Sequence, residues 1–160
     1  MRMHRYQYVF SGRPAADRLQ RMECKVISVV DDDPAVRESL AALLESHGYK
    51  VRLFESGEAY LSSDHVGRGR GLFLDVNLSG MSGFDVLRRL PARIPGHPVV
   101  MMTGRIDART RARAINAGAD ALLQKPLQAA TLLSMIGAEA KAGWSACDPA
   151  AICRGEWGTT

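Results

Sequence analysis

The sequence is poor in the residues that disulfide frameworks, base-stacking surfaces and membrane spans require. Three cysteines in 160 residues are too few and odd in number for a disulfide framework, which suits a reducing compartment. Aromatic residues make up 6%, which is little for a protein that stacks single-stranded bases. No apolar run approaches the roughly 20 residues that span a bilayer, and the N-terminus lacks the apolar core of a secretory signal. We therefore expect a cytoplasmic protein without a membrane partner.

What remains is the composition of one ordinary globular domain, with 46% hydrophobic and 24% charged residues. The net charge of +4 invites a nucleic-acid interpretation. However, five arginines against two acidic residues in 1–23 supply most of the excess. The rest of the chain is close to neutral, and we expect no direct contact with nucleic acid.

Three segments are predicted: an N-terminal extension over 1–23, one domain over 24–141 and a tail over 142–160. The extension has no sustained period. Met22 directly precedes a strong strand and is a plausible initiator, although a basic arm for an acidic partner is an alternative. The 23 residues after Gly137 are too few for a helix-turn-helix output domain, so we expect no second module.

Strand and helix patterns alternate through the domain. Continuous β-branched runs such as 26–30 predict strands covered on both faces, and the alternation over 49–54 predicts an edge strand. Strands are expected at 26–30, 49–54, 72–76, 98–103 and 121–124, with helices at 34–47, 56–66, 82–90, 107–117 and from Pro126 onward. This alternation predicts an α/β fold, a parallel sheet with helices on both faces.

The apolar positions of two helices predict which side chains are buried. On the first helix they are Val36, Leu40, Leu43, Leu44 and His47, and on the last helix Leu127, Ala130, Leu133, Met135 and Ile136.

Polar residues stand where four of these strands end. They are Asp31 and Asp32, then Asp75, Thr103 and Lys125. Parallel strands bring these ends to one edge of the sheet, where ligands bind. Clustered carboxylates repel one another and need a cation, and oxygen ligands without His or Cys favour Mg²⁺. An Asp can itself be a phosphoryl-accepting nucleophile, and neighbouring Lys and Thr can hold phosphoryl oxygens.

Asp33 directly follows this acidic pair and precedes Pro34. We expect it to cap the next helix, which leaves the two preceding aspartates for a metal.

Four segments in this order resemble the receiver domain of two-component response regulators, specifically single-domain FixJ-type receivers. They are VVDDD (29–33), LDVNLSGMSG (74–83), VVMMTG (99–104) and QKP (124–126). The resemblance covers about residues 24–137. It implies a doubly wound five-stranded parallel sheet in the flavodoxin-like order 2-1-3-4-5.

The resemblance also implies a role for each site residue. Asp75 would accept the phosphoryl group and would share Mg²⁺ with Asp31, Asp32 and the backbone carbonyl of Asn77. Asp32 would be a direct ligand of the metal.

On the same basis, Thr103 would bind phosphoryl oxygens and move on activation, and Lys125 would pair with the phosphoryl group and precede a cis Pro126. The implied partners are a sensor histidine kinase and a downstream protein or a second copy. The downstream protein or the second copy would bind at the face formed by 107–117, 121–124 and the last helix. The resemblance thus implies a phosphoacceptor that can dephosphorylate itself, and not an enzyme.

Two positions depart from the family pattern. Ser79 stands where proline is usual, which predicts a looser loop, and Leu122 stands where an aromatic switch residue is usual. They motivate an alternative, a protein-binding module that works without phosphorylation. A hydrolase would need a second carboxylate at the site, and the available one, Asp85, is expected to point away. DNA binding is the weakest option.

Overall fold

Five short strands form one parallel sheet in the computed structural model, which describes residues 25–91 and 97–136. Their order is β2-β1-β3-β4-β5, as the resemblance implied. The strands are β1 (Val26–Val30), β2 (Lys50–Phe54), β3 (Gly71–Asp75), β4 (Val99–Thr103) and β5 (Ala121–Gln124). Each predicted strand is present, and the ends agree to within one residue.

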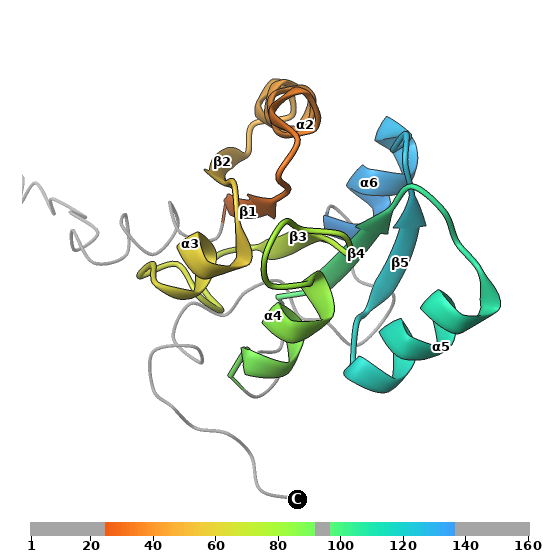
Figure 1. Cartoon of the computed structure of the whole chain (residues 1–160). Coiled ribbons are helices and arrows are strands. Elements are labelled where there is room, and N and C mark those ends of the chain that lie inside the picture. The colour runs from red at the N-terminus through yellow and green to blue at the C-terminus, as the bar shows by residue number, and fades with distance from the viewer. Residues whose placement is uncertain (1–24, 92–96, 137–160) are drawn as a thin grey trace, which may run out of the picture.

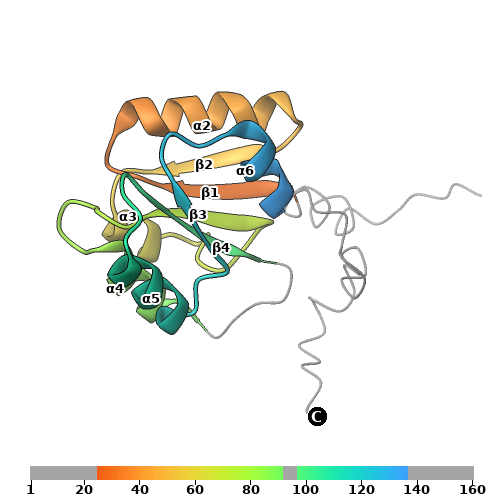
Figure 2. The ribbon, with the colours of Figure 1, turned by 90° about the vertical axis from the view of Figure 1, so that its right-hand side faces the viewer.

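Helices cover both faces of the sheet (Figures 1 and 2). They are α2 (Pro34–Ser46), α3 (Gly57–Leu61), α4 (Gly83–Arg89), α5 (Ala108–Ala117) and α6 (Ala129–Ile136). Helices α2 and α6 pack on the face that carries Ile27 and Phe73. Helices α3, α4 and α5 pack on the other face, against side chains such as Leu72 and Met101. The predicted two-sided architecture is confirmed.

The burial of each strand follows from its place in the sheet. All residues of the inner strands β3 and β4 are buried, which explains their continuous apolar sequences. Strand β2 lies at an edge, as its alternation predicted. Val51 packs against the α2 side of the core, whereas Leu53, expected on the same face, is 41% exposed.

Capping contacts occur at several helix ends, and the cap predicted from the sequence, Asp33, is among them. The Asp33 carboxylate accepts from the backbone N–H of Ala35 at 2.9 Å, so this aspartate is indeed the cap of α2. Ser82 and Asp85 form a reciprocal capping box at the start of α4. Gly118 ends α5 with a φ of 87°, a left-handed conformation that favours glycine.

Helix α3 is shorter than predicted, because it ends at Leu61 and not near Val66. The hydroxyl of Ser63 bonds back to the carbonyl of Tyr60 at 2.7 Å, and this local bond competes with helix continuation. The buried Tyr60 hydroxyl then accepts from the N–H of Gly67 at 3.1 Å and closes the following turn.

Helix α6 begins at Ala129, three residues later than predicted, after a cis Lys125–Pro126 peptide bond. Its buried residues are Leu132 and Ile136, one turn apart on the face toward the sheet.

Three predicted burials are therefore wrong. Ala130 and Met135 are exposed because they lie off the buried face of α6, and His47 is exposed because it lies at the end of α2. The other predicted positions on these two helices are buried or partly buried.

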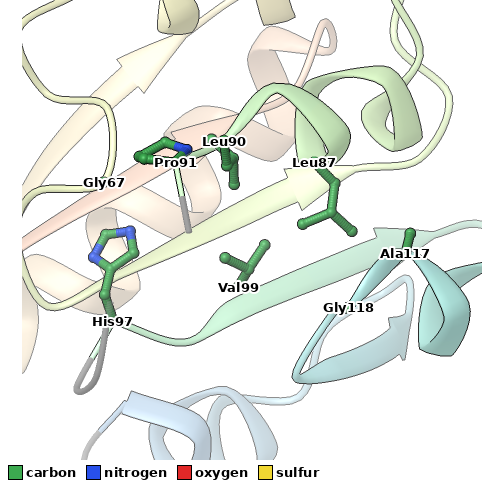
Figure 3. A pocket seen from close by; sticks show the side chains of 8 residues that line it. All are labelled: Gly67, Leu87, Leu90, Pro91, His97, Val99, Ala117 and Gly118. Carbon is green, nitrogen blue, oxygen red and sulfur yellow. The ribbon is translucent and has the colours of Figure 1, made fainter. Parts of the chain in front are cut away.

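A cavity of about 310 Å³ lies at the amino end of β4, away from the strand ends that carry the polar residues (Figure 3). It is lined by Gly67, Leu87, Leu90, Pro91, His97, Val99, Ala117 and Gly118. This lining is mostly apolar, and it includes the buried ring of His97. Its Nδ1 lies 3.1 Å from the carbonyl oxygen of Gly69, and its Nε2 has no partner among the described residues.

Three sequence predictions concern residues outside the described ranges. They are the domain boundaries near 23 and 141, the terminal extension and tail, and the lack of a disulfide framework among the three cysteines. Within the described ranges, no helix has both the length and the apolar character that crossing a membrane requires.

Gly83→Ala should destabilise the domain by about 3 kcal/mol, the upper part of the range for overpacking. A Cβ at this position would lie 2.1 Å from the backbone oxygen of Asp75, and neither backbone can give way cheaply. Gly104→Ala is the control, because a Cβ there meets nothing within 4 Å. Urea unfolding measures both variants, and equal stability losses would contradict the close approach.

Acid should destabilise the domain through His97. Burial lowers the pKa of His97 below its ordinary value near 6.5, although the Gly69 carbonyl and Asp120 oppose this shift. The unfolded chain then binds the proton more readily than the folded chain, so the free energy of unfolding falls as pH drops below about 6.5. Urea unfolding between pH 7.5 and 5 checks this. His97→Gln should lose this component, whereas His47→Gln at the exposed end of α2 should retain it.

Candidate functional site

The carboxyl ends of the central strands bring three aspartates together. Asp31 follows β1 and Asp75 ends β3, and the two strands are neighbours in the sheet. With Asp32 they form a cluster in which one carboxylate oxygen from each residue lies within 4.8 Å of the others. Asp31 is fully buried and Asp75 is 4% exposed, so both carboxylates require compensation within the protein.

Lys125 supplies that compensation from the end of β5. Its Nζ lies 2.5 Å from Oδ2 of Asp31 and 3.2 Å from Oδ1 of Asp75. Its backbone N–H donates to the carbonyl of Thr103 at 2.8 Å, which ties the lysine to the end of β4. One ammonium thus bridges two buried carboxylates that are 44 residues apart in the sequence.

The charges at this site shift one another's protonation. Burial, followed by the charge of Asp31, raises the pKa of Asp75 and outweighs the opposite effect of Lys125. Burial alone would lower the pKa of Lys125, but the two carboxylates outweigh it, and its pKa is raised. The lysine therefore remains a cation at neutral pH.

Asp32 is held by a different partner. Both the hydroxyl and the backbone N–H of Ser79 donate to its Oδ2, at 2.6 and 3.1 Å. The hydroxyl bond is the main reason that the pKa of Asp32 is lowered. The looser loop predicted from serine at position 79 is therefore not what the structure has, because this serine is tied to the acidic cluster.

Thr103 lies at the end of β4 and is 2% exposed. Its Oγ1 donates to the carbonyl of Arg105 at 3.0 Å and accepts from the N–H of Arg105 at 3.3 Å. The hydroxyl is thus engaged by its own loop, and the structure records no bond between it and the carboxylates. The fold brings Thr103 to the predicted edge of the sheet without joining it to Asp75.

Asn77 is exposed in the loop after β3. Its backbone N–H bonds to the Asp75 carboxylate and favours the ionised form, which works to lower the pKa of Asp75. The predicted ligand, its carbonyl, belongs to the same short loop beside the cluster.

Two further residues position the site and were missed from the sequence. Nη1 of Arg37, on the first turn of α2, donates to the carbonyl of Asp31 at 2.7 Å. Oε1 of Glu58 on α3 accepts from the N–H of Met81 at 3.1 Å and fastens the loop after β3. Closeness in sequence to Asp31 could have suggested Arg37, but nothing local links Glu58 to a loop 23 residues away.

The cluster fits a hard divalent cation. Three carboxylates offer only oxygen ligands, and ligand atoms from all three approach closely enough to share one ion. Sites that hold Mg²⁺ use one or two carboxylates and keep several waters, so this donor set and its partial exposure suit that ion. Asp32 and the loop at Asn77 provide the open side of the cluster.

Asp85, the carboxylate that a hydrolase would need, is engaged elsewhere. It accepts from Ser82 in the capping box and pairs with Arg88 one turn along α4. It is not among the carboxylates of the cluster, as the sequence predicted.

Comparison with known proteins identifies relatives of this fold and site. Residues 27–137 match the family model of the response regulator receiver domain. Transcriptional regulatory protein FixJ of Azorhizobium caulinodans is 40% identical over 113 residues, which cover 70% of this chain and 53% of that protein. Response regulator protein TodT of Pseudomonas putida is 34% identical over 140 residues, 86% of this chain and 62% of that protein. The chain thus spans about half to two thirds of the length of these curated relatives.

Solved structures give the same result. A CheY-like receiver domain protein from Methanospirillum hungatei superimposes with a TM-score of 0.63 at 30% identity, covering 71% of this chain and 90% of that chain. A receiver protein from Burkholderia phymatum gives a TM-score of 0.60 at 34% identity, covering 70% and 94% of the two chains.

Lys125→Met should lower the free energy of unfolding by about 3 kcal/mol without divalent cations, because it leaves two buried carboxylates without their cation. Lys50→Met on the exposed edge of β2 is the matched control and should change stability by less than about 0.5 kcal/mol. Urea unfolding in the presence of a chelator makes the comparison. A Lys125 variant as stable as the control would show that the bridge is energetically unimportant.

Proposed function

The chain belongs to the response regulator receiver domain family, and we propose that Asp75 accepts a phosphoryl group from a sensor histidine kinase. The observation that carries the proposal is the bridging of Asp31 and Asp75 by Lys125. This arrangement places a fixed positive charge 3.2 Å from one oxygen of the proposed nucleophile.

The proposed reaction is a direct transfer of the phosphoryl group to one oxygen of Asp75. A carboxylate oxygen of Asp75 forms a bond to phosphorus while the bond between phosphorus and the donor's leaving group breaks. The leaving group takes the electron pair, and Lys125 offsets the negative charge on the transferred group. The leaving group is an imidazole of the kinase or the acetate of acetyl phosphate.

Asp31, Asp32, Asp75 and the carbonyl of Asn77 would hold Mg²⁺, which when bound supplies further positive charge to the phosphoryl oxygens. Asp31 and Asp75 are already ordered by Lys125, and Asp32 by Ser79. The residues proposed for the metal are therefore positioned before it arrives, which reduces the ordering cost of binding.

Phosphorylation would then change the bonding of Thr103. Its hydroxyl donates to the carbonyl of Arg105, and a phosphoryl group on Asp75 offers a charged acceptor that makes stronger bonds. The exchange would draw the loop after β4 toward the acceptor and alter the start of α5. The output would thus be a change in protein binding at the face of α5, β5 and α6, and the chain would act as a phosphoacceptor and not as a turnover enzyme.

Helix α5 carries exposed groups that a protein partner or a second copy would contact. Ile115 on α5 is 67% exposed. Arg109 and Arg111 on the same helix are exposed as well, whereas Arg113 turns toward α4, where its guanidinium carbon lies 4.2 Å from the centre of the Phe84 ring. An apolar residue among arginines suits a protein surface with acidic groups.

A second candidate, binding that is independent of phosphate, is favoured by Leu122. This partly buried side chain packs against the core on the α5 side, where an aromatic switch residue is usual. The two candidates differ in one measurement, the self-association of the chain with and without acetyl phosphate and Mg²⁺. Self-association that is measurable and equal in both conditions would favour the second candidate.

Incubation with acetyl phosphate and Mg²⁺ should add one phosphoryl group to the chain, as measured by intact mass. Asp75→Asn should abolish the addition because an amide is not a nucleophile here, and a chelator should reduce it at least tenfold in the wild type. Asp64→Asn, an exposed carboxylate in the turn after α3, is the control and should leave uptake unchanged. Absent uptake in the wild type, or undiminished uptake in Asp75→Asn, would reject Asp75 as the acceptor.

A further inference from the structure

We propose that Ser79 is a positioning residue that holds Asp32 in place for the divalent cation. The inference rests on the proposed function, since it concerns the metal that the phosphoryl transfer would use. Ser79 stands at a position where this chain departs from the usual pattern of its family, and the proposal gives that serine a structural role.

The geometry joins one residue to one carboxylate oxygen twice. The Ser79 hydroxyl donates to Oδ2 of Asp32 at 2.6 Å, and the backbone N–H of the same serine donates to the same atom at 3.1 Å. Hydrogen bonds to an ionised acceptor are shorter and stronger than neutral ones. Two donors from one residue also fix the direction of the carboxylate, because they constrain it from two points.

Asp32 needs this support more than its neighbours do. Asp31 and Asp75 are buried and lie within ion-pair distance of Lys125. Asp32 is partly exposed, and within the described residues it forms no ion pair with this lysine. Without Ser79 its side chain would sample several rotamers in solvent, and a cation would have to order it on binding.

The two bonds do not occupy the whole carboxylate. Both end on Oδ2, so Ser79 leaves the second oxygen, Oδ1, to a cation. A metal-binding carboxylate commonly has its other oxygen hydrogen-bonded in this way, and loss of that bond typically weakens metal binding tenfold or more. We therefore expect Ser79 to support metal binding and not to compete with it.

The serine is itself held from the far side of its loop. Oε1 of Glu58 accepts the N–H of Met81 at 3.1 Å, and the N–H of Gly83 donates to the carbonyl of Val76 at 3.0 Å. The loop therefore has fixed points on both sides of Ser79, and its bond to Asp32 links the end of β1 to a braced segment.

The experiment is a Mg²⁺ titration of the full 160-residue chain without phosphodonor, followed by backbone amide NMR shifts. Ser79→Ala removes the hydroxyl donor and keeps the N–H, and should weaken the apparent Kd for Mg²⁺ about tenfold. Ser79→Thr keeps a hydroxyl and should stay within about twofold of the wild type. Ser134→Ala, on the exposed side of α6 and away from the cluster, should bind as the wild type does.

The outcomes separate this inference from the proposed function. A wild type that does not bind Mg²⁺ would contradict the proposed function itself. A wild type that binds, with an alanine variant that binds equally well, would overturn the positioning role alone. Tighter binding by the alanine variant would also overturn it, since it would make Ser79 a competitor of the metal. Amide shifts remote from the site report whether each variant keeps the fold.

Discussion

A single ammonium between two buried carboxylates is the interaction on which this site depends. Asp31 and Asp75 could not both stay ionised and buried without a cation, because the loss of hydration and their mutual repulsion would oppose it. Lys125 satisfies both carboxylates at once, at 2.5 and 3.2 Å. That arrangement requires β1, β3 and β5 to end at the same edge, and this is what the parallel strand order provides.

The chain also packs closely around Asp75. The first residue of α4, Gly83, lies so near the Asp75 backbone that a Cβ would be 2.1 Å from its carbonyl oxygen. The glycine allows the helix to begin directly beside the strand end. The loop between them remains short and is braced by Glu58. Asp75 is thus fixed by backbone contacts, and its charge is balanced by Lys125 from the end of another strand.

The three carboxylates of the cluster divide into two kinds. Two are buried, and a lysine compensates their charge; the third is partly exposed and is directed by the hydroxyl of Ser79. This division suits a site that must stay stable without a metal and still offer oxygen atoms to one. Burial supplies rigidity where charge is neutralised, and the hydrogen bonds of Ser79 supply it where the site opens to solvent.

The strands and helices, their alternation and the residues at the strand ends were predictable from local patterns, because strand and helix periodicity and capping are local properties. The sequence also predicted the parts that the structure brings together, Asp31, Asp32, Asp75 and Lys125, and it placed Thr103 at the same edge of the sheet. It could not determine how those parts are paired, since contacts between residues 44 or more positions apart depend on strand order and on the lengths of the intervening helices. The bond between Ser79 and Asp32, which spans 47 residues, could be found only in the folded chain, because it forms once the ends of β1 and β3 lie side by side.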